Sequence, residues 1–289
     1  MDRFTAEQVR RNREAREGWD LYHHHRERVT NLLLYSAGSP DQTLCVLGAG
    51  NCNDLDLKRL RERFRQIQLI DLDGEALAAG CEQQGMTDDA GILLLGGIDV
   101  TNLAPRLQAW KPDQPVAAHE IQGALLDAMA RPLPGLPTEQ FDVVVSVGLL
   151  TQIIEMVLLS LGPQHPQFLE LLSAVRLRHL RLLLELTKPG GTAALIFEVV
   201  STLTCPELLE TSEAALWPVL QQAIEKHNFF TGANPAIINQ IFQRDPELSA
   251  AIVKLGHTNP WLWTFFTHTY AVCAFTARKT AKVSSPVTP

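Results

Sequence analysis

The chain has 289 residues, of which 46% are hydrophobic and 20% are charged, and its formal net charge is −7. This composition is typical of a globular protein with enough apolar material for a core. The acidic balance argues against nucleic acid or an anionic membrane as a partner. The five cysteines are scattered without a CxxC pair, no apolar run approaches the roughly twenty residues of a membrane span, and no apolar leader follows Met1. We therefore expect free thiols and a cytoplasmic protein.

Residues 1–42 have a helical pattern. Trp19 and Tyr22 interleave with arginines and acidic residues whose charges nearly cancel, which indicates a solvated helix face rather than a basic arm. The three consecutive histidines at 23–25 suggest a metal site at first sight. Adjacent helical residues point about 100° apart, so the three cannot easily converge on one ion, and no metal is expected.

The central motif is residues 43–60, TLCVLGAGNCNDLDLKRL. An apolar run breaks at the closely spaced glycines of 48–50 and then continues in a helical pattern. This order predicts a strand–loop–helix nucleotide site, in which the missing Cβ atoms let the backbone approach a ligand. About twenty residues later a second apolar run ends on Asp71, where a carboxylate can accept hydrogen bonds from two ribose hydroxyls.

The loop distinguishes between two classes of cofactor. The dinucleotide fingerprint GxGxxG requires a glycine at the position of Asn53, and the following Asp54 and Asp56 would repel a pyrophosphate. A nicotinamide-dependent oxidoreductase is therefore the less favoured interpretation.

Strand-like and helical runs alternate along the following chain. This βαβ order predicts parallel strands joined by right-handed crossovers. The later expected elements are strands at 67–71, 92–95, 141–147 and 192–200, a long helix at 167–187, and a helical segment at 205–254. The last two apolar runs, 261–266 and 269–277, are too close together for a crossover helix, so they must form an antiparallel hairpin.

Together these features resemble the class I S-adenosylmethionine (SAM) methyltransferases. Gly48 and Gly50 match the first two glycines of the family's motif I, while Cys52 stands where a third is common, and the KPGG turn at 188–191 precedes the fifth strand. The resemblance implies an α/β fold with a Rossmann-like open, mostly parallel seven-stranded sheet, a C-terminal antiparallel hairpin and helices on both faces. The implied organisation is a helical segment covering the site at 1–42, a methyltransferase-like domain at 43–279 with a helical lid insertion at about 205–260, and a disordered tail at 280–289.

In such a sheet, ligands bind outside the carboxyl ends of the strands, at the switch point of strand order. The resemblance gives Asp99 the role of accepting from the adenine amino group, although it could instead cap the turn before Leu103. Asp54 could meet an ammonium group or favour the start of its own helix. The expected cofactor-binding residues are Gly48, Ala49, Gly50, Asn51, Asp54, Asp71, Asp99 and Ser146.

The leading hypothesis is SAM-dependent methyl transfer to a small, partly apolar acceptor. Glu198, at the end of the fifth strand, is the candidate general base, and a structural carboxylate is the alternative. A non-catalytic SAM-binding or protein-interaction module of the same fold is the second hypothesis. Aromatic residues between 205 and 266 are expected to line an acceptor pocket, while more than half of them, Trp263 and Phe265 especially, are expected only to pack the lid against the sheet. The few basic residues of this segment argue against nucleic acid.

Overall fold

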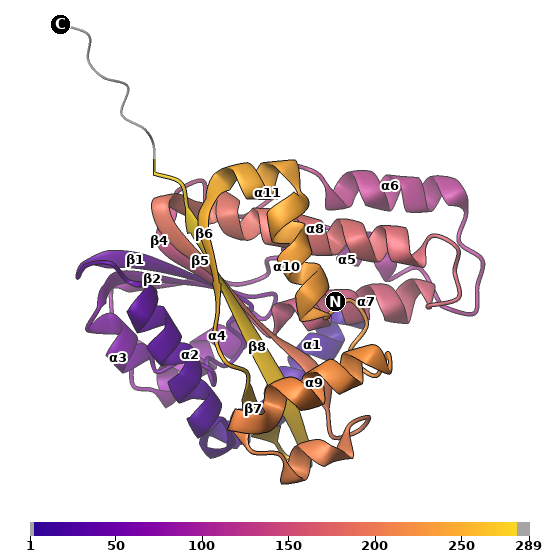
Figure 1. The fold of residues 1–289 in the computed structure, drawn as a ribbon. Helices are drawn as coiled ribbons and strands as arrows, with labels where there is room; N and C mark the ends of the chain where they lie inside the picture. The colour runs from indigo at the N-terminus through magenta and orange to yellow at the C-terminus, as the bar shows by residue number, and fades with distance from the viewer. Residues whose placement is uncertain (1–2, 282–289) are drawn as a thin grey trace, which may run out of the picture.

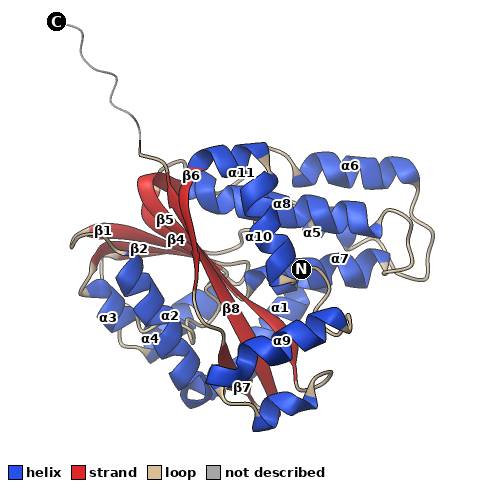
Figure 2. Ribbon diagram, in the orientation of Figure 1, coloured by secondary structure: helices blue, strands red, loops and turns tan. Residues whose placement is uncertain are grey.

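A central β-sheet with helices on both faces organises the computed structural model, which describes residues 3–281 (Figures 1 and 2). The strand order is β3-β2-β1-β4-β5-β8-β6, and β7 also pairs with β8. Neighbours among β1 to β5 are parallel, whereas β8 is antiparallel to β5, β6 and β7. The strands are β1 (Gln42–Leu47), β2 (Phe64–Ile70), β3 (Ile92–Leu95), β4 (Phe141–Val147), β5 (Thr187–Ser201), β6 (Ile252–His257), β7 (Trp261–Phe265) and β8 (His268–Lys279).

The predicted fold class is confirmed, including the antiparallel hairpin of β7 and β8. Over residues 3–281 the sheet has eight strands rather than the seven expected, because β6 and β7 share one edge of β8. β6 pairs with the end of β8 and β7 with its beginning. Pro260 lies between β6 and β7, where the missing N–H cannot extend the ladder.

The helices form a layer on each face of the sheet. Figure 1 shows α2, α3 and α4 on one side and α5 to α8 on the other. In the described part of the chain, no helix is both long and apolar enough to cross a membrane. The helices are α1 (Arg3–Ala15), η1 (Arg16–Tyr22), α2 (His23–Ser36), α3 (Leu57–Arg61), α4 (Gly74–Gln83), α5 (Ala104–Leu107), α6 (Ala118–Ala128), α7 (Leu149–Leu161), α8 (Phe168–Leu186), η2 (Pro206–Glu210), η3 (Glu213–Ala215), α9 (Leu216–Glu225), α10 (Pro235–Arg244) and α11 (Pro246–Ala251).

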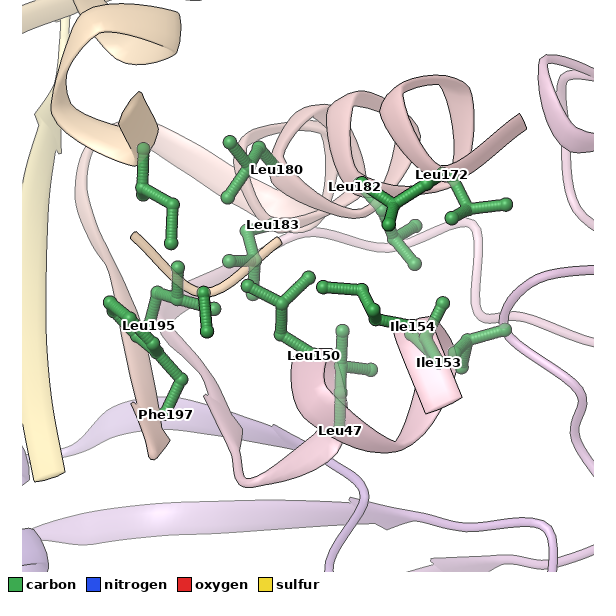
Figure 3. Close-up of a cluster of buried hydrophobic side chains, with 14 of the residues drawn as sticks. Leu47, Leu150, Ile153, Ile154, Leu172, Leu180, Leu182, Leu183, Leu195 and Phe197 are labelled. Atoms are coloured by element: carbon green, nitrogen blue, oxygen red, sulfur yellow. The ribbon is translucent and has the colours of Figure 1, made fainter. Parts of the chain in front are cut away.

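Each face of the sheet has its own apolar core. Successive side chains of β1 point to opposite faces. Leu44 and Val46 therefore join the core beneath α2 to α4, and Cys45 and Leu47 join the core beneath α5 to α8. Figure 3 shows the second core, in which Leu47 lies among leucine and isoleucine side chains of α7 and α8. A sheet covered on both faces explains why its central strands are apolar along their whole length.

Two elements differ from the sequence-based expectation. The sequence predicts a helix to Lys254, but β6 begins at Ile252 because it pairs with the end of β8. α7 follows β4 with no charged residue before Glu155, so its sequence resembles a continuation of the apolar strand. In addition, the glycine loop continues as turns as far as Asp56, which caps the short helix α3.

The segment 205–260 packs mainly beside the sheet. Apolar side chains such as Leu220 and Phe242 enter the core on the α7–α8 side, and α11 contacts α8. The tail predicted at 280–289 lies, from residue 282 onward, outside the described residues.

Gly80 in α4 lets that helix pack directly against the glycine loop. A Cβ atom there would lie 2.3 Å from the carbonyl oxygen of Asn51. Alanine normally stabilises a helix interior by about 1 kcal/mol over glycine, but this clash is with rigid backbone. We expect Gly80→Ala to lower the free energy of unfolding by about 1–3 kcal/mol in denaturant titrations. The control is Gly38→Ala, whose new Cβ would meet only Gln42 at 3.8 Å; equal stability of the two variants would contradict the expectation.

Candidate functional site

The site lies at the carboxyl ends of β1 and β4, where the strand order reverses direction. In open α/β sheets, ligands bind at this switch point. Two clefts open here, and both are lined by Gly48 and Asp71. We call them the apolar cleft and the polar cleft after the side chains that line them.

The apolar cleft encloses about 750 Å³ of empty space, part of it open to solvent. Its walls come from the loops after β2 and β3 and from α7, and α1 closes one side with Gln8 and Arg11. Arg11 donates to both carboxylate oxygens of Glu155 in α7, at 2.6 and 3.0 Å, which fixes α1 across the cleft. The apolar lining residues are Phe4, Ile70, Leu72, Ile98, Val100, Ala104, Leu149, Ile153, Met156 and Leu159.

Asp71 is buried directly after β2, as its position in the sequence predicts. Its Oδ2 accepts from the backbone N–H of Gly50, and its Oδ1 accepts from that of Asp73, both at 2.8 Å. Burial raises the pKa of Asp71 to about 6, and these two hydrogen bonds oppose the rise. The carboxylate thus joins the loops after β1 and β2, and it borders both clefts.

Asn12 of α1 connects this region to the N-terminal helix. Its side-chain amide donates to Asp73, 3.1 Å away, and its backbone carbonyl oxygen accepts from the side-chain amide of Asn51. Asp73 also caps α4. The glycine loop is consequently held between α1 and α4.

Asp99 lines the apolar cleft, and its carboxylate also organises its own turn. Oδ1 accepts from the backbone and hydroxyl of Thr101, and Oδ2 accepts from the backbone of Ala104 at 2.8 Å. The capping role that the sequence left open is therefore present at this position.

The structure does not bring Ser146 to either cleft. Its hydroxyl lies 2.8 Å from Nε2 of His179 in α8, and both side chains are buried. The reason is the alternation along β4, which directs this position into the core. The other seven expected cofactor residues, and Glu198, all line one or both clefts.

The polar cleft encloses about 540 Å³ and contains buried polar atoms without hydrogen-bond partners among the described residues. Three are acceptors, Oδ1 of Asn51, of Asn53 and of Asp54, and one is a donor, Nε1 of Trp263. The amide orientation of Asn51 is fixed because its nitrogen donates to a carbonyl. Buried polar groups are normally paired, so these atoms are available to a polar ligand.

His25 forms one wall of the polar cleft. Its Nδ1 accepts from the indole N–H of Trp261 at 3.0 Å, and its ring stacks on that of Trp263. Because an indole N–H can only donate, Nδ1 is the acceptor in this bond, which leaves Nε2 as the ring nitrogen that carries a proton. Nε2 lies 3.2 Å from Oδ1 of Asp54, in a contact that lacks hydrogen-bond alignment.

Glu198 is buried at the end of β5, where a register shift opposite β8 follows it. Its Oε2 lies 2.6 Å from the hydroxyl of Thr151 in α7. A Cβ on Gly148 would lie 3.1 Å from its Oε1, and Gly148 has φ of +63°. Glycine at 148 therefore suits both the tight turn into α7 and the carboxyl group beside it.

The sequence did not single out His25, Thr151 or Gln152. His25 had a detectable signal, since it lies three residues after Tyr22 and four before Val29 on the buried face of its helix. Thr151 and Gln152 belong to α7, which the sequence did not predict.

The aromatic side chains of the last third lie in different places from those expected. Trp263, expected only to pack against the sheet, lines the polar cleft. Trp217, Phe230 and Phe242 pack with the apolar core, and no described residue of 205–260 lines either cleft. Their apolar faces are buried beside β5, β8 and α8 instead.

No protein-family model and no curated protein matches this chain. Solved structures similar to it include the N-methyltransferase NodS from Bradyrhizobium japonicum WM9 in complex with S-adenosylhomocysteine (SAH), at 14% identity and a TM-score of 0.42, covering 88% of this chain and 86% of that one. Magnesium protoporphyrin IX methyltransferase (ChlM) from Synechocystis PCC 6803 with bound SAH has 11% identity and a TM-score of 0.46, covering 89% and 83%. The YcgJ protein from Bacillus subtilis has 8% identity and a TM-score of 0.47, covering 90% and 100%.

The buried Ser146–His179 pair makes stability depend on pH. Burial lowers the pKa of His179 to about 4 from its ordinary 6.5. Because the unfolded chain then binds more protons between these values, this contribution to stability is complete above about pH 6.5 and is lost as pH falls through the window. We expect the wild type to lose on the order of 2 kcal/mol more than His179→Gln between about pH 7 and pH 4.5 in denaturant titrations.

Glutamine can still hydrogen-bond to Ser146, and it does not titrate. Buried Asp71 gives the opposite sign, since its raised pKa makes ionisation destabilising as pH rises through about 6. The contribution of Asp71 is the same in the wild type and in His179→Gln, so it cancels when their pH profiles are compared. If the free energies of unfolding of the two proteins changed in parallel with pH, His179 would not be the cause of the pH dependence.

Proposed function

We propose that this protein transfers a methyl group from SAM to a small, partly apolar acceptor. The observation that carries the proposal is the pairing of two unlike clefts around one buried carboxylate, Asp71. One cleft is apolar; the other presents unpartnered polar atoms and has no lysine or arginine among its described lining residues. An adenosyl group with a charged amino-acid tail has the same division of polarity.

The residues present fit this cofactor. Asp71 would accept hydrogen bonds from the ribose hydroxyls, and the apolar side chains of Leu72 and Leu149 would flank the adenine. When bound, the sulfonium group supplies an electrophilic methyl group.

The amino-acid end of the cofactor would occupy the polar cleft. Unpartnered oxygens of Asn51 and Asp54 suit an ammonium group, and the free N–H of Trp263 suits a carboxylate. Since each of these atoms is buried without a partner, a zwitterionic ligand would remove a desolvation cost that the free protein bears.

The same features disfavour a dinucleotide. The glycine loop leads into turns rather than a helix, and α3 begins only at Leu57. No aligned helix N-terminus therefore follows the loop to hold a pyrophosphate. The carboxyl groups of Asp54 and Asp71 would instead repel one.

Glu198 is the residue we assign to proton removal from the acceptor, because its carboxyl group is the acid at the β5 end of the polar cleft. Alignment of the acceptor with the methyl group would supply much of the rate. The net charge of −7 supports a small acceptor over nucleic acid. All five cysteines are free, buried thiols, which supports a cytoplasmic location.

SAH should stabilise the protein against heat. A ligand that binds only the native state at about 100 times its dissociation constant adds about 2.7 kcal/mol, which corresponds to a rise in Tm of roughly 5–10 °C for a chain of this size. The measurement is a thermal-shift titration with NAD(H) as the matched control. No shift with SAH at millimolar concentration, or an equal shift with NAD(H), would refute the cofactor assignment.

Replacing Asp71 by asparagine should weaken SAH binding by about 10- to 100-fold, because hydrogen bonds to a charged group contribute roughly 1.5–3 kcal/mol. With a pKa of about 6 in the wild type, affinity should also fall below about pH 6 as the carboxylate is protonated. The SAH affinity of Asp71→Asn should not fall in this pH range. Calorimetry with exposed Asp88→Asn as the charge-matched control tests both points, and wild-type affinity in Asp71→Asn would contradict them.

A further inference from the structure

The hydroxyl of Thr151 lies within hydrogen-bond distance of two acceptors. Its Oγ1 is 2.8 Å from the carbonyl oxygen of Gly148 and 2.6 Å from Oε2 of Glu198. A hydroxyl group carries one hydrogen, and a carbonyl oxygen carries none. One hydrogen cannot point directly at both acceptors, so two well-aligned hydrogen bonds need a second hydrogen, which a protonated Glu198 supplies. In this arrangement Glu198 is a carboxylic acid that donates to Thr151, which in turn donates to Gly148.

The surroundings of Glu198 agree with this proton count. Burial is the largest influence on the pKa of Glu198 and raises it, while the bond to Thr151 opposes the rise. A positive charge on His25 would lower the pKa of Glu198, and the nearby negative charge of Asp54 raises it. On the other elements facing this group, Tyr22 and Tyr270 are phenols whose own pKa values are raised by burial. His25 is the remaining titratable neighbour, and its Nδ1 accepts a hydrogen bond from Trp261.

We propose that Glu198 and Thr151 form a charge-responsive pair, in which Glu198 is protonated in the free cleft and releases its proton when an organic cation enters. The O–H bond at Oε2 breaks and the proton passes to water. The hydroxyl hydrogen of Thr151 then turns from Gly148 toward Oε2. The cleft thereby gains one negative charge beside a positive ligand.

This inference rests on the proposed function, because it concerns how the polar cleft distinguishes SAM from SAH. SAM and SAH share the same nucleoside, ammonium and carboxylate, and they differ by the sulfonium charge and its methyl group. The pair would therefore favour the charged donor over the neutral product. Glu198 becomes a carboxylate, able to accept a proton, only while a cation is bound. Thr151 acts as a positioning residue through Glu198.

Calorimetry with SAM and with SAH, from about pH 5 to about pH 8 in buffers of different ionisation enthalpy, tests the proposal. We expect SAM binding to release about one proton more than SAH binding in the acidic part of this range, and the ratio of the two affinities to rise by up to about tenfold per pH unit. Asp71 is proposed to contact the nucleoside that both ligands share, so its titration affects both affinities equally and cancels in their ratio. Equal proton release and a flat ratio would overturn the proposal.

Variants of Glu198 and Thr151 test whether the two residues form the charge-responsive pair or only a structural contact. Glu198→Gln should make the ratio independent of pH. Thr151→Val keeps the side-chain shape but removes the hydroxyl, so it should shift the pH midpoint of the ratio, and Thr151→Ser should restore it. The control is Thr258→Val, which removes a buried hydroxyl that has no partner among the described residues. Identical profiles for Thr151→Val and Thr151→Ser would remove Thr151 from the proposal.

An infrared measurement without ligand keeps this inference separate from the proposed function. The free wild type near neutral pH should show a carboxylic-acid carbonyl band that is absent in Glu198→Gln and displaced in Thr151→Val. Absence of the band in the wild type would overturn the inference even if both nucleosides bind. If neither nucleoside binds, the proposed function fails, and the band alone decides whether Glu198 is protonated.

Discussion

A buried carboxylate at the end of β2 holds the loops of the site together. Asp71 accepts backbone hydrogen bonds from Gly50 after β1 and from Asp73 after its own strand. Burying an ion is costly unless hydrogen bonds offset the loss of water, and the two backbone donors offset part of it. Asp73 then caps α4 and accepts from Asn12 of α1. One chain of polar contacts therefore fixes the strand, the following helix and the N-terminal helix relative to the clefts.

Close packing restricts the same loop from the other side. Gly80 brings α4 against the carbonyl of Asn51, so the loop cannot move toward that helix without a clash. Cys52 has φ of +56°, in the left-handed region that glycine adopts more easily. Its side chain is buried in the core beneath α2 to α4. That burial offsets the backbone strain, which explains how a cysteine can stand where the resemblance has a third glycine.

The two clefts differ in polarity because different elements build them. Loops after β2 and β3 and the apolar helix α7 line one cleft, whereas the glycine loop, the start of α2 and the end of β5 line the other. The acids Asp54, Asp71 and Glu198 line the polar cleft, and His25, 3.2 Å from Asp54, is the one basic side chain among its described lining residues. The negative charge of Asp54 raises the pKa of Glu198, and Nδ1 of His25 accepts a hydrogen bond from Trp261. A positive ligand would relieve this accumulation of negative charge, which links the shape of the site to the charge of what it binds.

The sequence by itself determined the five parallel strands, the terminal hairpin, the glycine turn and the position of Asp71. These follow from local patterns: apolar runs of strand length, glycines that end a run, and the short spacing between the last two strands. Only the tertiary structure decided which side chains meet. Thr151 and Glu198 are 47 positions apart and His25 and Trp261 are 236 apart, and the buried segment 205–260 lies beside the sheet rather than over the clefts. A pattern of apolar residues shows which face of an element is buried. The partner on that face is decided by how helices and strands pack across the sheet, and no local sequence signal contains that information.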